Sequence, residues 1–388
     1  MRVLAAFDKF KDSLSAPEAC AAAARAIAAM GKGWEVDSCP LADGGDGFAD
    51  VLTQSAGGSK TRLTVAGPRG EPVAASIGFV PLERLPGEAR VQLGAVAGEP
   101  GGSIAVIEMA AASGLALLAP GARDPLLASS WGTGELIRFA SGARVRAILL
   151  GVGGSATHDL GLGALAALGI GFTTSAGIRL NPPTPATWPR IRSIDGRISG
   201  CMPPILIACD VDNPLLGPRG AVAAYGSQKG LKAEDAPALE VETARMASLV
   251  CRHFGQPESL MAVPGAGAAG GIAFSLMAAA GATLLNGFDL VASWLGLDAR
   301  LADADIVLTG EGRFDDTSLR GKGPGAVVRR ARALGKSVHV FAGQISLTGD
   351  FPGLESHAIN PPGLPLADAL AQAPALLALA VERAMSGQ

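Results

Sequence analysis

Apolar runs of strand length alternate with segments of helical periodicity along much of the chain. The first run, residues 2–7, predicts a buried strand, and a helix is expected after it over residues 16–30. Ser15 and Glu18 have the spacing of a capping box at the start of that helix. A strand at 304–308, followed by further helices, repeats the alternation near the end of the chain. This pattern predicts an α/β fold with a parallel sheet.

The pattern of apolar positions changes between residues 61 and 86. Apolar and polar residues alternate there on both sides of a glycine-proline turn at 67–70. A period of two predicts antiparallel strands joined by that turn. Near Leu301 the chain returns to α/β alternation. Because 388 residues exceed what one simple core usually holds, we expect a second domain to begin near Thr61.

Residues 146–169 combine an apolar strand, a glycine turn and a run of leucines at helical spacing. The backbone N–H groups of Gly153, Gly154 and Ser155 are expected to point together at the start of the helix. Such donors have no partner within the helix, and the helix dipole favours an anion there, so the turn suits a phosphate or a carboxylate. An ordinary tight turn explains the glycines equally well. The polar side chains that follow, ending at Asp159, favour a binding site.

Charged residues also follow the first two predicted strands. Lys9, Lys11 and Ser13 come after the first, where ligands usually lie in open α/β sheets, although a solvated charged loop is the alternative. Asp43 and Asp46 flank a double glycine after the second strand. They are candidates for holding a cation or for binding substrate hydroxyls. The alternative is that Asp46 caps the next helix.

Two later segments carry the chemistry of phosphoryl transfer. Asp210 and Asp212 stand two apart after an apolar strand, a suitable pair for a hard cation such as Mg²⁺, and Lys229 adds a positive charge further on. The cluster after residues 304–308 supplies carboxylates for metal or base and cations for developing charge. Its members are Glu311, Arg313, Asp315 and Lys322.

Composition narrows the class of protein. The net charge of −3 argues against a nucleic-acid partner, and the five cysteines form no C-x-x-C pair, which fits reduced thiols. Charged residues interrupt the N-terminus too early for a signal peptide. The uncharged stretch 259–288 is too rich in glycine to predict a membrane span. Residues 265–270 match G-x-G-x-x-G, but no clear strand precedes them, so the dinucleotide interpretation is weak.

Seven segments together resemble the bacterial type I glycerate kinases (glycerate 2-kinases), in that family's order and across essentially the whole chain. They read DKFKDSLSA, LADGGDG, GVGGSATHDLGLG, CDVDNPLLGPRGA, SQKG, PGAGAAGG and TGEGRFDDTSLRGK. The resemblance implies ATP-dependent phosphorylation of D-glycerate, most often to 2-phosphoglycerate, in sugar-acid or glyoxylate catabolism. It also implies a Rossmann- or flavodoxin-like domain of residues 1–62 and 296–388, with a mixed α/β domain of residues 63–295 inserted and the active site in the cleft between them. The chain departs from the family at His158, Leu160 and Asp46, which leaves the reaction class intact and the substrate contacts open.

The expected enzyme is therefore a cytoplasmic kinase that uses ATP and Mg²⁺, as a monomer or homodimer. The expected roles are: catalysis by Asp210, Asp315 and Lys322; substrate binding by Asp43, Asp46, Arg313, Lys9, Lys11 and Ser13; phosphate or nucleotide binding by Gly153, Gly154, Ser155, Asp159, Lys229 and Glu311; metal binding by Asp210 and Asp212. The alternatives are a glycerate 3-kinase or related hydroxy-acid kinase, an NAD-dependent hydroxy-acid dehydrogenase, and a non-enzymatic sensor of small acids.

Overall fold

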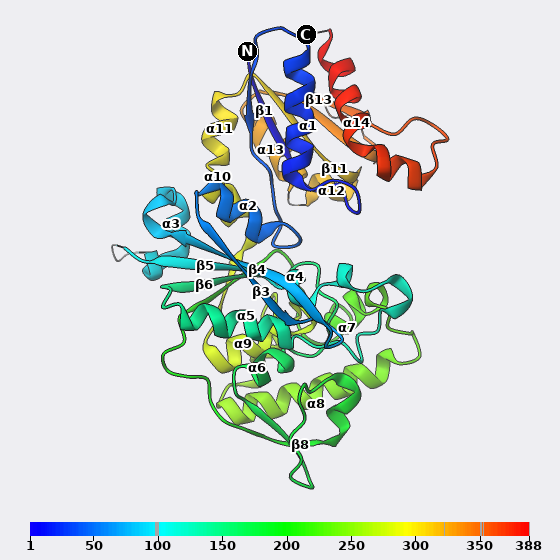
Figure 1. Cartoon of the computed structure of the whole chain (residues 1–388). Coiled ribbons are helices and arrows are strands. Elements are labelled where there is room, and N and C mark those ends of the chain that lie inside the picture. The colour runs from blue at the N-terminus through cyan, green and yellow to red at the C-terminus, as the bar shows by residue number, and fades with distance from the viewer. Residues whose placement is uncertain (98–100, 322, 350, 352, 388) are drawn as a thin grey trace. The chain divides into compact units, whose positions relative to one another are not determined.

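The computed structural model describes the chain except residues 98–100, 322, 350, 352 and 388. It forms two compact units, one of Met1–Asp43 with Val291–Gln388 and one of Gly44–Leu290 (Figure 1). The expected boundaries at 62/63 and 295/296 lie some residues away from this division. Residues 44–62 belong with the second unit because the helix α2 (Phe48–Ser55) packs on strands of its sheet.

The first unit is built on a five-stranded parallel sheet with the order β13-β12-β11-β1-β2. Its strands are β1 (Arg2–Phe7), β2 (Glu35–Ser38), β11 (Ile306–Asp315), β12 (Ser337–Ser346) and β13 (Leu354–Ala358). Its helices are α1 (Ala16–Ala29), α11 (Leu297–Asp303), α12 (Asp316–Arg320), α13 (Pro324–Ala333) and α14 (Leu366–Met385). From β1 the chain proceeds to β2 on one side, and from β11 to β12 and β13 on the other. The switch point of the sheet, where ligands bind in such folds, therefore lies between β1 and β11.

The core of the first unit follows from the alternation of side chains along β1. Val3, Ala5 and Phe7 are buried in one cluster with residues of α1 and α14, two helices that pack side by side on this face (Figure 1). Helices α11 and α13 pack against the sheet as well, each in contact with β1. The expected capping box at Ser15 and Glu18 is present at the start of α1. Both faces of the parallel sheet are thus covered, as this class of sheet requires.

The second unit contains a six-stranded mixed sheet, ordered β10-β9-β6-β5-β4-β3, and a separate hairpin. The sheet strands are β3 (Ser59–Ala66), β4 (Pro72–Pro81), β5 (Ser103–Glu108), β6 (Ala147–Gly151), β9 (Ile205–Cys209) and β10 (Thr283–Asn286), and the hairpin strands are β7 (Gly171–Thr174) and β8 (Ile191–Asp195). The helices after α2 are α3 (Gly87–Leu93), α4 (Ala110–Ser113), α5 (Trp131–Gly142), α6 (Leu162–Ala167), α7 (Ala221–Tyr225), α8 (Ala236–Phe254) and α9 (Ile272–Ala280). The division between the units falls within α10 (Gly287–Leu295), after Leu290. β3 and β4 pair antiparallel, as their alternation predicts, whereas β5, β6, β9 and β10 are parallel. The α/β fold class expected from the sequence is confirmed.

One element differs from the sequence prediction. β11 does not end near residue 308 but continues to Asp315, because β12 hydrogen-bonds along it and pairs Glu311 with Ala342 and Arg313 with Gln344. The expected loop of charged residues is therefore part of a strand. The uncharged stretch 259–288 folds into short turns, α9 and β10, and no helix of the described chain is long and apolar enough to cross a membrane.

Candidate active site

The carboxyl ends of β1 and β11 carry a buried carboxylic acid, Asp8. Its backbone N–H donates to the carbonyl of Gly310 at 3.0 Å, and its side chain is only 8% exposed. Burial raises the pKa of Asp8 to about 7, and the negative charge of Asp43 acts in the same direction against the opposing charge of Lys9. Lys9 binds both neighbours, with its N–H on Asp8 Oδ1 at 2.7 Å and its Nζ 3.3 Å from Asp43 Oδ1.

Sequence analysis did not single out Asp8 as a functional residue. The available signal was its position directly after the first buried strand, beside Lys9. The structure adds that a Cβ on Gly323 would lie 3.4 Å from Asp8 Oδ2, so the carboxyl faces the residue that precedes α13. Gly323 has a φ of +63°, which suits glycine. An acid at a strand end beside a helix N-terminus is well placed to handle a proton or a charged ligand.

The extension of β11 places Glu311, Arg313 and Asp315 at alternate positions, and hence on one face of the strand. Arg313 Nε lies 3.3 Å from Asp315 Oδ2, and the backbone N–H of Ser318 donates to Asp315 Oδ1 at 3.2 Å. Burial raises the pKa of Glu311, and the charges of Asp315 and Asp43 add to this, while the Ser318 hydroxyl opposes it. The acidic side chains at the carboxyl ends of β1 and β11 are therefore close enough for their negative charges to interact.

The loop after β1 supplies the remaining groups expected in the first unit. Lys11 is exposed, and its backbone N would lie 3.4 Å from a Cβ on Gly312, so the loop lies against β11. The Ser13 hydroxyl donates to the carbonyl of Phe10 at 3.1 Å and stabilises its own turn. Lys322 lies outside the described residues.

In the second unit, the glycine turn after β6 packs against residues 44–46. The N–H of Gly153 donates to the carbonyl of Gly44 at 2.9 Å, so this expected phosphate donor is used within the protein. Gly154 has a φ of +69°, and a Cβ there would lie 3.1 Å from Asp46 Oδ1 and 3.2 Å from Ala110 Cβ. This positive φ is one that glycine adopts readily and other residues rarely do.

Lys229 is buried directly beneath this turn. Its Nζ donates to Ser155 Oγ at 3.0 Å and to the carbonyl of Thr157 at 2.7 Å, and the residue is only 2% exposed. Burial lowers the pKa of Lys229 to about 7, against the opposing charge of Asp159. The sequence singled out both Ser155 and Lys229, and the structure brings them together.

Asp159 anchors the same loop from inside the protein. Its carboxylate is fully buried and accepts hydrogen bonds from the N–H and hydroxyl of Ser130 at 2.7 and 2.8 Å. The N–H groups of Gly161 and Gly163 donate to it at 3.0 and 3.2 Å. With four donors around it and no exposed surface, Asp159 holds the loop in shape.

The glycine-rich segment 265–270, which matches G-x-G-x-x-G, packs against the loop after β6. No strand leads into this segment, and the carbonyl of Gly270 accepts the N–H of Leu160 at 3.0 Å. A Cβ on Gly270 would lie 2.3 Å from the carbonyl oxygen of Thr157. These glycines allow two backbones to pack closely, and the segment lacks the preceding strand that a dinucleotide fingerprint requires.

Asp46 does not cap α2, contrary to the alternative raised from the sequence. Gly47 precedes this helix with a φ of +92°, and no side chain of the N-cap residue caps it. Instead Glu108, at the end of β5, accepts the N–H groups of Gly47 and Ala49 at 2.9 and 3.3 Å. Glu108 therefore satisfies the donors at the start of α2. Asp46 is exposed, and its carboxylate faces Gly154.

The two aspartates expected to bind metal have different partners. Asp210 Oδ1 accepts the N–H of Phe288 at 3.1 Å, at the start of α10. Asp212 is exposed and lies 3.7 Å from a guanidinium nitrogen of Arg219. Asp210 thus accepts from a backbone amide, whereas Asp212 pairs with a guanidinium.

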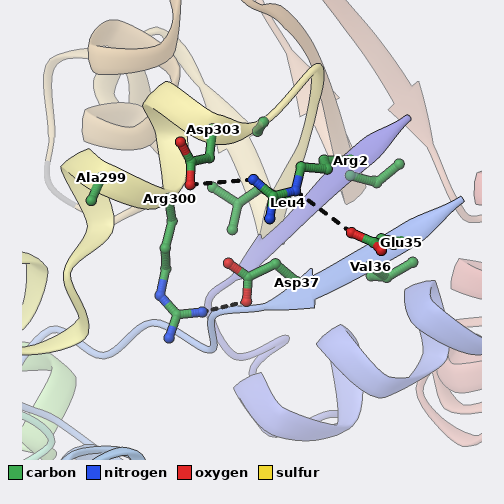
Figure 2. A pocket seen from close by; sticks show the side chains of 10 residues that line it. Arg2, Leu4, Glu35, Val36, Asp37, Ala299, Arg300 and Asp303 are labelled. Carbon is green, nitrogen blue, oxygen red and sulfur yellow. Dashed lines mark hydrogen bonds and ion pairs between the residues drawn. The ribbon is translucent and has the colours of Figure 1, made fainter.

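A pocket of about 540 Å³ lies at the opposite, amino-terminal ends of β1 and β2, beside α11 (Figure 2). Charged pairs line it: Arg2 lies 3.6 Å from Glu35 and 3.3 Å from Asp303, and Arg300 pairs with Asp37. Because ligands of parallel sheets bind at the carboxyl ends of the strands, this pocket is not the candidate active site.

Comparison with known proteins identifies the family. Residues 3–387 match the sequence model of the Glycerate kinase family. The chain belongs to the glycerate kinase family. It is 36% identical to Glycerate kinase of Bacillus subtilis (strain 168), over 96% of this chain and 94% of that protein, and 36% identical to Glycerate 2-kinase of Escherichia coli (strain K12), over 93% and 89%. A solved structure of a candidate glycerate kinase 2 from Salmonella typhimurium LT2 is 35% identical, with a TM-score of 0.76 and coverage of 100% and 98%.

Membership of the glycerate kinase family confirms the resemblance inferred from the seven motifs, and with it the enzyme class, a kinase acting on an alcohol group. The matched residues include both strand ends of the first unit and the β6 loop of the second.

Proposed function

We propose that this chain transfers the γ-phosphoryl group of ATP to the 2-hydroxyl of D-glycerate, giving 2-phosphoglycerate in the breakdown of sugar acids or glyoxylate. The names of the relatives indicate glycerate as the substrate, and the name of the Escherichia coli protein, Glycerate 2-kinase, indicates the 2-hydroxyl as the acceptor. The observation that carries the proposal is the buried Asp8 at the switch point of the first sheet, between two further acids and Lys9.

Asp8 is proposed as the group that accepts the proton of the attacking hydroxyl. A kinase needs a carboxylate that orients its acceptor alcohol, and a base works best when its pKa lies near the operating pH. Burial and the neighbouring acids give Asp8 a pKa of about 7, which meets this condition. Asp210 and Asp315 remain proposals for catalysis, as does Lys322.

Positive groups near Asp8 are proposed to bind the carboxylate of glycerate. Lys9, Lys11 and Arg313 belong to the same strand ends and loop, and Arg313 is exposed beside Asp315. Asp43, Asp46 and Ser13 are proposed to contact the hydroxyl groups of the substrate. Carboxylate and hydroxyl oxygens accept the hydrogen bonds that a polyol donates.

The β6 loop is proposed to bind phosphate oxygens. Gly154 and Ser155 form the turn, and Lys229 donates to the Ser155 hydroxyl from below. Lys229 and Asp159 act as positioning residues in this proposal because both are buried. A phosphate near the loop would favour the protonated lysine and raise its pKa.

Mg²⁺ is proposed to accompany ATP. The donor chemistry fits, since Glu311 and Asp43 offer carboxylate oxygens whose charges also raise the pKa of Asp8, and a divalent cation relieves such crowding. Asp210 and Asp212 are the other proposed ligands. When bound, Mg²⁺ neutralises charge on the phosphate oxygens. A cytoplasmic location and a monomeric or homodimeric state complete the proposal.

Single-hydroxyl analogues test the proposal with the purified chain. We expect ADP release in a coupled assay with ATP, Mg²⁺ and D-glycerate, and slower release with D-lactate, which has only the 2-hydroxyl. 3-Hydroxypropanoate, which has only the 3-hydroxyl, should be inert, and NMR of the product should show the 2-phosphate. The 3-phosphate would identify a glycerate 3-kinase. No glycerate-dependent ADP, with NAD(H) altering the fluorescence of Trp131 or Trp294, would favour the dehydrogenase.

A further inference from the structure

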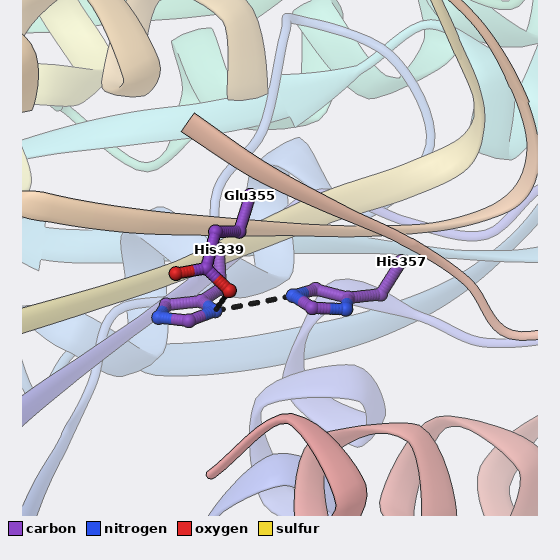
Figure 3. A group of neighbouring side chains, drawn as sticks. All are labelled: His339, Glu355 and His357. Carbon is purple, nitrogen blue, oxygen red and sulfur yellow. Dashed lines mark hydrogen bonds and ion pairs between the residues drawn. The ribbon is translucent and has the colours of Figure 1, made fainter. Parts of the chain in front are cut away.

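Three side chains with metal-binding atoms meet at the edge of the first sheet, outside the residues proposed for the kinase reaction. The parallel register of β12 and β13 sets His339 opposite Glu355, and His357 follows two residues later on the same face. Figure 3 shows the two imidazole rings side by side, with the Glu355 carboxylate beside His339. Two of the four histidines of the chain take part.

The distances match those of a tetrahedral metal site. His339 Nδ1 lies 3.1 Å from His357 Nε2 and 3.5 Å from Glu355 Oε2, and the three ligand atoms lie within 4.8 Å of one another. Zinc binds histidine nitrogen and carboxylate oxygen at about 2.0–2.2 Å, so two of its tetrahedral ligand atoms lie roughly 3.3–3.6 Å apart. The two distances from His339 lie close to this range, and Glu355 is exposed on an edge strand, where its side chain can adjust.

We propose that His339 Nδ1, His357 Nε2 and Glu355 bind one divalent transition-metal ion of the zinc class. Two imidazole nitrogens and one carboxylate form a ligand set that suits zinc, whereas Mg²⁺ and Ca²⁺ prefer oxygen ligands alone. The site has a buried and an open side, because His339 is fully buried while the Glu355 side chain is 57% exposed. The ion enters past Glu355, and water fills the fourth position.

The surroundings prepare the two histidines for a cation. The ring of Phe341 stacks on His357 with centroids 4.8 Å apart and restricts its orientation. Because the ligands come from neighbouring strands, the bound ion ties the edge strand β13 to β12 and stabilises this side of the first unit.

Metal titration of the full chain tests the proposal. Zn²⁺ is added after treatment with a chelator, bound zinc is counted after dialysis, and the unfolding temperature is followed in parallel. Co²⁺ serves as a second probe, because its visible absorption is intense in tetrahedral sites. His339 is buried, so the test variants are His357→Ala and Glu355→Gln. His253→Ala and Cys201→Ser are the matched controls, since Cys201 is exposed, His253 is partly exposed, and each could bind zinc by itself.

We expect one Zn²⁺ per wild-type chain, a higher unfolding temperature with Zn²⁺, and a tetrahedral Co²⁺ spectrum. His357→Ala should weaken binding at least about tenfold and abolish the thermal shift, while both controls retain them. Equal zinc binding by wild type and His357→Ala, or loss of binding in a control alone, would overturn the proposal. So would a wild-type chain that binds no zinc at micromolar concentration. Kinase activity is a separate readout, so neither result bears on the proposed function.

Discussion

Lys229 Nζ donates a hydrogen bond to Ser155 Oγ at 3.0 Å, although 74 positions separate the two residues. The amine therefore lies inside the protein, directly beneath the loop proposed to bind phosphate. Burial lowers its pKa to about 7, so the lysine releases its proton far more readily than an exposed lysine. A site for phosphate is thus coupled to the protonation of a buried amine.

This coupling predicts how the stability of the fold depends on pH. The unfolded chain holds the lysine proton up to about pH 10.5, whereas the folded chain releases it near pH 7. The unfolded state binds more protons between these values, so the free energy of unfolding should rise with pH above 7. In Lys229→Met, which keeps the length of the side chain, this rise should be smaller.

Urea unfolding at pH 7, 8 and 9 measures the difference between wild type and Lys229→Met. Higher pH is avoided because burial raises the pKa of the Cys20 and Cys39 thiols to about 12, which makes stability fall with pH above about 9. The same slope in both proteins would mean that Lys229 is not buried in the folded state.

Asp8→Asn should separate catalysis from stability. Removing a general base lowers kcat by about 10²–10⁴. In the wild type, kcat/KM should fall as the pH drops below about 7, because the proton acceptor becomes protonated. The folded pKa of Asp8 lies above its ordinary value, so the charged form destabilises the fold, and stability from this group is lost as the pH rises from about 4 to 7.

The Asn variant removes this charge, and its unfolding temperature at pH 8 should equal or exceed that of the wild type. Asp12→Asn is the control, since Asp12 is exposed and has a φ of +63°, which asparagine tolerates. An inactive but destabilised Asp8→Asn would point to a structural role for this carboxyl.

Gly154→Ala tests the loop after β6. The φ of +69° costs an alanine about 1–2 kcal/mol, and its Cβ would also press on Asp46 and Ala110. We expect a rise in the KM for ATP of at least about tenfold together with this loss of stability. Gly142→Ala, in a helix with open space around it, should leave both unchanged or raise stability slightly. A large fall in melting temperature with normal kinetics would make the loop a scaffold only.

Glu108→Ala and Asp46→Ala should affect different properties, the first the stability of the fold and the second the binding of glycerate. Glu108 accepts two N–H groups at the start of α2, so its loss should destabilise the fold by about 1 kcal/mol. Asp46 is exposed and caps nothing there, so Asp46→Ala should change the free energy of unfolding little and raise the KM for glycerate. Urea titration and steady-state kinetics on both variants check this, and a destabilised Asp46→Ala would restore its role as a cap.

Local signals made much of the fold predictable. β1 and α1 follow an apolar pattern and a capping box that act within a few positions, and their bounds agree closely with the sequence prediction. The antiparallel strands β3 and β4 were predicted from their period of two for the same reason. The length of β11 was not predicted, because its charged second half becomes a strand only through hydrogen bonds with β12.

The residues of the candidate site could also be predicted only in part. Lys9, Asp43 and Lys229 could be named from charges at the ends of predicted elements. Their partners could not, since Ser155 meets Lys229, and Glu108 meets Gly47, only after distant strands come together. Asp8 went unnoticed because an aspartate beside two lysines resembles a solvated loop, and its burial is a property of the folded sheet.

The continuation of β11 to Asp315 has a consequence for how this protein can diverge from its relatives. Glu311, Arg313 and Asp315 share a face only because the strand has a period of two and is held in step by β12. Inserting or deleting one residue after Gly310 would exchange that face for the one bearing Gly312 and Phe314. Evolution can therefore replace each of these charges singly, whereas a change in their spacing removes all three from the site at once.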